Sequence, residues 1–278
     1  MDPKPVHLGP TYGAQFADES VVGAYRHRAP YPAETFTLLT ALLPTAGRAA
    51  GSAAGSATGG RVLEVGSGTG DLTRPLAAFV DEIDAVEPSA SMRAAARQLP
   101  GGESVRIQWI AADAETAPLR AAYDLAVAAE SLHWTDWPIV LPRIGRALAP
   151  GAMLALVGRQ REERPWWGGL NDLIPRYSTN RDYAPYDLVH ELTQRDLFRE
   201  RGRAETAFVS FEQTVEAYIE SFHSRNGFSR ERMAPTAASG FDSELRALVM
   251  PHAQDGVLRQ AVSALVVWGS IPIVPEAG

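Results

Sequence analysis

Cysteine is absent from the 278 residues of this chain, which excludes disulfide bonds, thiolate zinc sites and a cysteine nucleophile. Long hydrophobic runs are absent too, since no 18 consecutive residues are apolar and no basic–apolar leader opens the chain. We therefore expect a cytoplasmic protein with no membrane partner. Lysine occurs only at Lys4, and this arginine bias, with the Ala/Gly-rich stretches, is typical of a GC-rich bacterial genome.

Positive charge is also in short supply. The 26 Lys and Arg residues face 33 Asp and Glu residues, which gives a formal net charge of −7 and a pI near 5.4. Because nucleic acids attract basic surfaces, no nucleic acid is expected as the main partner. His, Asp and Glu show no clustered ligand spacing, so no metal is expected. The length and the 45% hydrophobic content fit one large domain, or a domain with a smaller insert.

The chain is organised around residues 61–79. Val62, Leu63 and Val65 form a short apolar run typical of a buried parallel strand. Glycines follow at alternate positions, and an amphipathic run over residues 71–79 predicts a helix. A strand, a glycine turn and a helix N-terminus open a nucleotide-binding βαβ unit. The three glycines are Gly66, Gly68 and Gly70.

Two details indicate which nucleotide is bound. In the dinucleotide fingerprint the third glycine lies three positions after the second, whereas Gly70 comes one residue early. Glu64 places a carboxylate inside the apolar strand, where burial is costly unless a cation or donors meet it. The methionine end of S-adenosylmethionine carries an ammonium group that would supply this partner. The run from Val62 to Gly70 resembles motif I of class I S-adenosylmethionine-dependent methyltransferases.

This resemblance implies a cofactor site at the ends of successive strands. Glu87 lies about twenty residues past the glycines, where nucleotide-binding folds place an acid on the ribose hydroxyls. Met92 either packs on the adenine or belongs only to the core. In the methyltransferase pattern Asp113 accepts from the adenine amino group, the alternative being a solvated turn aspartate. The full implied set is Tyr12, Arg28, Glu64, Gly66, Ser67, Gly68, Gly70, Glu87, Pro88, Met92, Asp113, Ala114, Glu130 and Ser131.

Residues 12–32 resemble the N-terminal stretch of small-molecule methyltransferases related to the trans-aconitate methyltransferase group. In that group a helix that bears tyrosine and arginine caps the cofactor. The resemblance implies that Tyr12, Tyr25 and Arg28 close over the methionine carboxylate, which an arginine fork can bind bidentately. The alternative is an ordinary surface helix whose apolar stripe includes Phe16 and Tyr25.

Residues 129–137 follow the fourth expected strand. Ligands sit outside the carboxyl ends of strands in open α/β sheets, so this loop faces the transferred methyl group. Its Ser-Leu-His-Trp segment resembles the corresponding methyltransferase loop. His133 is therefore a candidate base or donor that orients the acceptor, or else a packing residue beside Trp134. His223, in the expected cap, is a weaker catalytic candidate.

Periodicity and the resemblance together predict an α/β fold. We expect a Rossmann-like, doubly wound, seven-stranded sheet, mostly parallel with an antiparallel last strand, plus a helical cap insert. Residues 1–60 would form N-terminal lid helices and a linker, 61–158 the S-adenosylmethionine-binding core, and 159–278 cap inserts with strands six and seven. Low-complexity residues 44–60 are the expected linker. The expected strands cover residues 62–65, 82–87, 105–110, 123–128, 153–157, 205–211 and 262–268.

The implied function is transfer of a methyl group from S-adenosylmethionine to a small molecule, at a carboxylate or hydroxyl of a specialised metabolite. A hydroxyl or amine acceptor benefits from a general base, whereas a carboxylate is already ionised. One alternative is a methyltransferase-fold protein that keeps the cofactor as a structural part and catalyses another reaction. The other is an NAD-linked oxidoreductase, against which Glu64 and the early Gly70 argue.

Overall fold

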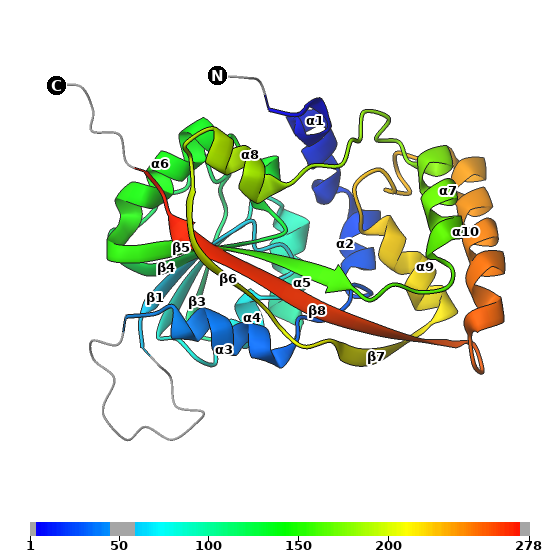
Figure 1. The fold of residues 1–278 in the computed structure, drawn as a ribbon, viewed down its shortest axis with the longest axis horizontal. Helices are drawn as coiled ribbons and strands as arrows, with labels where there is room; N and C mark the ends of the chain where they lie inside the picture. The colour runs from blue at the N-terminus through cyan, green and yellow to red at the C-terminus, as the bar shows by residue number, and fades with distance from the viewer. Residues whose placement is uncertain (1–3, 45–58, 273–278) are drawn as a thin grey trace.

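The computed structural model describes residues 4–44 and 59–272. Nearly all of the expected linker lies outside these residues. Within the two described ranges, no helix combines the length and the apolar character that a bilayer crossing requires. The chain forms one sheet with helices on both faces, and a further group of helices lies beyond one end of the sheet (Figure 1).

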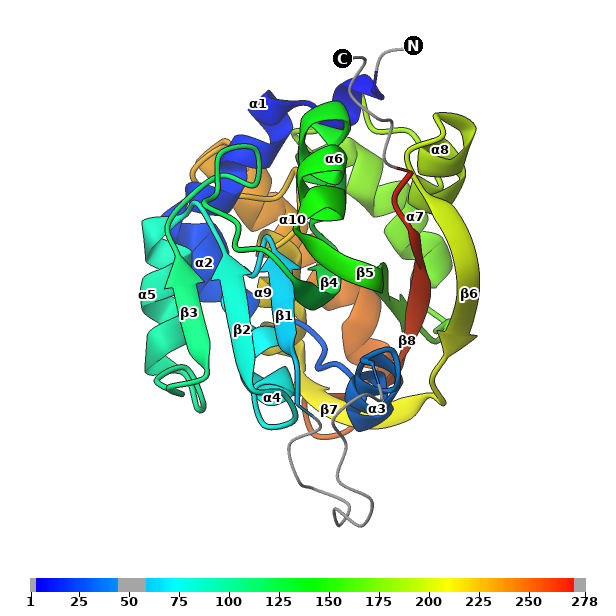
Figure 2. The same cartoon turned by 90° about the vertical axis from the view of Figure 1, so that its left-hand side faces the viewer.

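Five parallel strands form the main part of the sheet. Their order is β3-β2-β1-β4-β5, and it reverses direction along the chain between β1 and β4 (Figure 2). In open α/β sheets such a reversal opens a ligand-binding crevice at the carboxyl ends of the strands. The strands are β1 (Arg61–Val65), β2 (Glu82–Val86), β3 (Ile107–Ile110), β4 (Tyr123–Ala129) and β5 (Leu148–Arg161).

The antiparallel edge contains two short strands where the sequence predicted one. β8 (Val257–Ser270) pairs with β5, and its other side pairs with β6 (Arg199–Glu205) and then with β7 (Val209–Thr214). Between them, the Thr206 hydroxyl accepts from the N–H of Ala264 at 3.0 Å. The single strand predicted over residues 205–211 is therefore wrong at its centre. The sheet has eight strands, although β6 and β7 share one edge position.

Helices bury the two faces of the sheet. α6 (Trp137–Ala147) packs Trp137, Val140 and Ile144 against one face, as its i, i+3, i+4 spacing predicts. On the other face, α3 (Ala33–Ala41) and α4 (Thr73–Leu76) contribute a second apolar cluster. α4 is only one turn of the helix expected over residues 71–79. The remaining helices beside the sheet are α5 (Ala90–Gln98) and α8 (Leu188–Gln194).

A separate cap core lies at the far end of β5 and β8 (Figure 1). α7 (Trp167–Tyr177), α9 (Val215–His223) and α10 (Pro235–Val249) pack around phenylalanine rings, including Phe228 and Phe241 at 4.7 Å between ring centroids. The sequence pattern predicts only a short helix over residues 244–250, and α10 begins nine residues before it. β5 reaches Arg161, beyond the strand end expected at residue 157, and so carries the sheet into the cap.

The N-terminal segment bridges the sheet and the cap. α2 (Glu19–Tyr25) lies beside α9 (Figure 1). The N–H of Gly227 donates to Gln15 at 3.0 Å, and the Ser229 hydroxyl donates to Asp18 at 2.6 Å. These bonds fix the segment over the carboxyl ends of the strands. It also contains the short elements η1 (Val6–Leu8), α1 (Pro10–Gly13) and η2 (Ala14–Ala17).

Candidate active site

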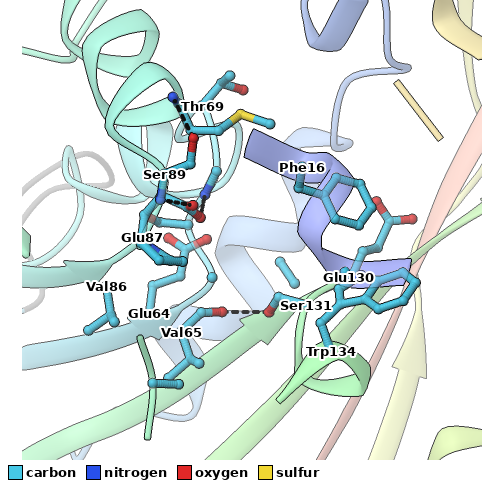
Figure 3. A pocket seen from close by; sticks show the side chains of 18 of the residues that line it. Phe16, Glu64, Val65, Thr69, Val86, Glu87, Ser89, Glu130, Ser131 and Trp134 are labelled. Carbon is cyan, nitrogen blue, oxygen red and sulfur yellow. Dashed lines mark hydrogen bonds between the residues drawn. The ribbon is translucent and has the colours of Figure 1, made fainter. Parts of the chain in front are cut away.

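A cavity of about 600 Å³ lies where the strand order reverses, at the carboxyl ends of β1, β2 and β4. Its volume falls in the range of cofactor and small-molecule sites, about 300–1,000 Å³. One wall comes from the glycine turn and the end of β2, and the opposite wall from the N-terminal segment and the loop after β4 (Figure 3). The location matches the expectation from the fold.

The glycine turn brings backbone close to the cavity. Gly66 has φ of +70°, and a Cβ atom added there would lie 2.5 Å from the Cβ of Ser131. The N–H groups of Gly66 and Ser67 donate to the carbonyl of Val86, at 2.9 and 3.0 Å. Only glycine fits Gly66, both sterically and in backbone conformation. The turn is thereby locked onto β2.

Glu64 and Ser67 place buried polar groups at this wall. Glu64 is 1% exposed, lines the cavity and accepts a short hydrogen bond from the hydroxyl of Thr73. Burial raises the pKa of Glu64 to about 8, and the charges of Asp71 and Glu87 raise it further while the Thr73 bond opposes. The buried Ser67 hydroxyl has no hydrogen-bond partner in the part of the chain that the structure describes. A ligand with a cation and hydrogen-bonding groups would satisfy both residues.

Glu87 directly follows β2 and lies at the rim of the same wall (Figure 3). Its Oε2 accepts from the N–H of Gly68 at 2.9 Å, and its Oε1 accepts from the N–H of Ser89 at 2.9 Å. Burial raises its pKa, which the two backbone donors partly offset. Each carboxylate oxygen has a second acceptor position, so Glu87 can still accept two hydroxyl groups of a ligand.

The next two loops continue the cavity. Ser89 caps α5 by accepting from the N–H of Met92 at 3.3 Å, and the buried Met92 lines the cavity with Pro88. Asp113 and Ala114, which follow β3, line it from the neighbouring loop. The Met92 side chain beside the exposed Asp113 carboxylate is suited to bind a planar ring that carries a hydrogen-bond donor.

The opposite wall is rich in arginine. Glu130 has φ of +52°, and its carboxylate lies 3.0 Å from Nε of Arg159 and 3.7 Å from Nη1 of Arg28. Burial alone would raise the pKa of Glu130, but Arg159 and then Arg28 outweigh it and hold that pKa at about 2. Ser131, the next residue, donates to the carbonyl of Val65. Glu130 is thus a permanently ionised anchor between two arginines.

Several cavity residues were missed from the sequence. Arg159 lines the cavity and stacks on Tyr31 at 4.3 Å, and Phe16 and Trp134 face each other at 5.2 Å between ring centroids. The one available signal for Arg159 was a charged residue two positions beyond the apolar end of the fifth strand. Phe16 was assigned only to an apolar stripe.

Two of the implied cofactor residues do not line the cavity. The Tyr12 hydroxyl donates to Asp182 on the outer side of the N-terminal segment, whereas Tyr25 and Arg28 do line the cavity. Gly70, with φ of +75°, lies behind the turn, where an added Cβ would be 2.7 Å from Trp109. Its glycine requirement is therefore structural. The other twelve residues of the implied set all border the cavity.

Neither candidate histidine borders the cavity. The half-buried His133 ring packs on Trp134 and Tyr186, at 4.6 and 6.1 Å between centroids, and burial lowers its pKa to about 4. His223 is 0% exposed in the cap, with Nδ1 2.8 Å from the carbonyl of Phe228 and Nε2 2.7 Å from Asp242. Both nitrogens of His223 are committed to the cap, which does not support its catalytic candidacy.

The sheet order and the glycine-turn cavity define a class I methyltransferase fold. Residues 62–151 match the family model described as "Methyltransferase domain". Over these residues the chain is similar to the methyltransferase domains of that family. It is 35% identical over 154 residues to uncharacterized methyltransferases of Mycobacterium bovis and Mycobacterium tuberculosis, a match that covers 53% of this chain and 54% of each relative. The chain thus spans about half the length of these relatives.

Solved structures support the same fold over a longer span. A proposed type II methyltransferase from Anaeromyxobacter dehalogenans matches with a TM-score of 0.58 and 22% identity, over 90% of this chain and 99% of that one. A proposed methyltransferase from an antibiotic biosynthesis pathway of Anabaena variabilis matches with a TM-score of 0.55 and 16% identity, over 88% and 99%. At these identities the similarity establishes the fold alone. The trans-aconitate subgroup is not confirmed by any of these matches.

Proposed function

We propose that the chain transfers a methyl group from S-adenosylmethionine to a small molecule. The observation that carries this proposal is Glu64, a buried carboxylate that faces the cavity with a hydroxyl beside it and no cation among the described residues. A buried carboxylate is stable when a cation meets it. The ammonium group of the methionine end would be that cation.

Other residues would hold the remaining parts of the cofactor. Glu87 has acceptor capacity for the two ribose hydroxyls, and Met92 and Asp113 would contact the adenine. Arg28 would bind the methionine carboxylate, since it lines the cavity beside Tyr25.

The bound cofactor would supply an electrophilic methyl group on its sulfonium. The role of the chain would be to align the acceptor and exclude water, with Phe16, Tyr25 and Trp134 closing the cavity. Glu130, with a pKa near 2, would be a poor base at neutral pH, and His133 lies outside the cavity. A carboxylate acceptor, which needs no base, therefore fits better than a hydroxyl.

Calorimetry with S-adenosylhomocysteine tests the cofactor, with NADH as the competing ligand. We expect the wild type to bind S-adenosylhomocysteine with micromolar affinity and Glu64→Gln to bind it at least tenfold more weakly. The control Glu82→Gln changes the first residue of β2, at the end of the strand away from the cavity, and should leave this affinity unchanged. NADH binding without S-adenosylhomocysteine binding would overturn the proposal. Incubation with S-adenosylmethionine and pooled carboxylic acids should then yield S-adenosylhomocysteine. Cofactor binding with no product from any acceptor pool would favour a structural role for the cofactor.

A further inference from the structure

Beyond the cavity, the arginine wall continues into the cap. Along β5, Arg159 and Arg161 are two residues apart and so lie on the same face of the strand. Arg159 is paired with Glu130 inside the cavity. Arg161 is one step closer to the cap, where it opposes Val262 of β8, and its side chain has no hydrogen bond or ion pair with any described residue.

A second arginine approaches this point from the end of α9. Arg225 stacks on Phe222 at 3.8 Å, and its Nη2 atom is buried without a hydrogen-bond partner. The preceding residue, Ser224, accepts from Arg28 Nε at 2.9 Å through its hydroxyl and from Arg28 Nη2 at 2.7 Å through its carbonyl. Arg28 itself lines the cavity. The end of α9 is thereby fixed beside the cavity wall.

The charges here do not balance. Glu130 serves both Arg159 and Arg28, and Asp71, 3.7 Å from Arg159, is also shared with Arg74 at 3.4 Å. No acidic side chain of the described residues pairs with Arg161 or Arg225. Burial lowers the pKa of both guanidinium groups, and the charge of Arg161 lowers that of Arg225 further, whereas the charge of Glu130, which Arg159 and Arg28 already share, acts in the opposite direction. Two unpaired cations beside each other are costly in a partly buried place, and an anion would remove that cost.

We propose that Arg161 and Arg225 together bind an oxyanion of the methyl acceptor, a carboxylate or a phosphate, next to the arginine wall of the cavity on the side of the cap. This inference rests on the proposed function, because it names the ligand class of the same site. Arginine is suited to this role, since its planar fork binds carboxylate and phosphate through two parallel hydrogen bonds. The two arginines come from different parts of the fold, so the oxyanion would also fix the cap to β5.

The test uses the full chain saturated with S-adenosylhomocysteine, so that the cofactor's own carboxylate occupies its site. Malonate, inorganic phosphate and the neutral malonamide are titrated by calorimetry in a chloride buffer of constant ionic strength. We expect malonate or phosphate to bind and malonamide not to bind. Tighter malonate binding would assign a carboxylate, and tighter phosphate binding a phosphate group.

Arg161→Gln and Arg225→Gln should each weaken oxyanion binding by about tenfold or more, as expected when one charged hydrogen-bond donor pair is lost. The matched control is Arg259→Gln, an exposed arginine on β8 whose only partner among the described residues is Glu212 at 3.4 Å. All three variants should keep the affinity for S-adenosylhomocysteine. Arg225→Lys keeps the charge without the fork and should fall between the wild type and Arg225→Gln.

Oxyanion binding that is absent, or that survives both glutamine variants, would overturn the inference and leave the two arginines as packing residues. If Arg225→Gln fails to fold, Arg161→Gln decides alone, because that side chain has no hydrogen-bond or ion-pair partner to lose among residues 4–44 and 59–272. Failure of the proposed function would look different. S-adenosylhomocysteine would not bind to the wild type, while the oxyanion titrations could still be made on the free protein.

Discussion

The two ends of the cavity carry opposite charge. The glycine-turn end has carboxylates at or just beyond the ends of three successive strands, Glu64, Glu87 and Asp113. The arginine end combines Arg28 and Arg159 with the nearby Arg161 and Arg225. One end is therefore suited to an ammonium group and hydroxyls, and the other to anions. The methionine end of S-adenosylmethionine carries both charges and would engage Glu64 and Arg28 together, which leaves Arg161 and Arg225 for the acceptor.

The two ends also differ in how the chain builds them. The acidic end comes from consecutive βα units, in which each carboxylate follows its own strand. The arginine end is assembled from the N-terminal segment, the extension of β5 and the end of α9, which are up to about two hundred residues apart. Substitutions at the first end should change cofactor binding alone, and this separation can be tested directly.

The largest effect is expected from Gly66→Ala. The new Cβ would lie 2.5 Å from Ser131, at a φ of +70°. We expect the affinity for S-adenosylhomocysteine to fall by 100-fold or more, about 2.7 kcal/mol, because the turn must move. Phosphate binding at the arginine end should be unchanged. Gly23→Ala in α2, with open space around its Cβ, is the matched control and should bind as the wild type does.

Glu87→Ala should have the next largest effect. Loss of charged hydrogen bonds to the ribose is expected to weaken S-adenosylhomocysteine binding by about 1.5–3 kcal/mol, or roughly 10- to 150-fold. The fold should survive, since Glu87 follows the last residue of β2 and its two protein partners are backbone N–H groups of the adjoining turns. Calorimetry measures the affinity and circular dichroism the fold. An unchanged affinity would mean that the ribose does not lie at Glu87.

Sequence reasoning served the acidic end well because strand, turn and acid are neighbours in the chain. Glu64 and Glu87 could be placed from their spacing alone, and both line the cavity. At the edge of the sheet the same reasoning failed. Polar and apolar residues alternate over residues 205–211 as in a single strand. The break at Thr206 nevertheless depends on hydrogen bonds to Ala264 on β8, which no local pattern encodes.

Most residues of the arginine end could not be predicted from the sequence, because they too depend on tertiary contacts. Arg159, Arg161 and Arg225 belong to no motif, and they become neighbours only when β5 extends into the cap. Tyr12 and Tyr25 were assigned one role by resemblance, but a helical turn and a bend separate them, so Tyr12 contacts Asp182 instead. Side chains whose position depends on tertiary packing could not be assigned from spacing.

A subtler effect concerns proton release at Glu64. Because burial raises the pKa of Glu64 to about 8, the free protein holds this carboxyl mostly protonated at pH 7. An ammonium partner would ionise it, so binding of S-adenosylhomocysteine should release roughly 0.9 of a proton at pH 7 and much less above pH 8. Calorimetry in buffers of different ionisation enthalpy counts these protons.

Glu64→Gln should abolish this release. Binding by the wild type at pH 7 without proton release would mean that Glu64 is already ionised without the cofactor.

The raised pKa of Glu64 also has a consequence for the stability of the free protein. Since the folded pKa lies above the ordinary value of 4.5, ionisation of Glu64 should cost the free protein stability as the pH rises from about 4.5 to 8. Thermal unfolding of Glu64→Gln should therefore depend less on pH in this window.

The smallest effect is expected at His133, which belongs to neither end. Its ring packs on Trp134, which lines the cavity, and burial lowers its pKa to about 4. His133→Ala should thus lower the methyl-transfer rate by less than about tenfold, through a looser Trp134, and His133→Phe should restore it. Neither variant should change the pH dependence of the rate between pH 6 and 8, because the imidazole is neutral throughout this range.

Proton NMR of the His133 ring should show no titration above about pH 5. A rate loss of 100-fold or more that phenylalanine does not rescue would instead identify His133 as the general base, and would make a hydroxyl the better acceptor.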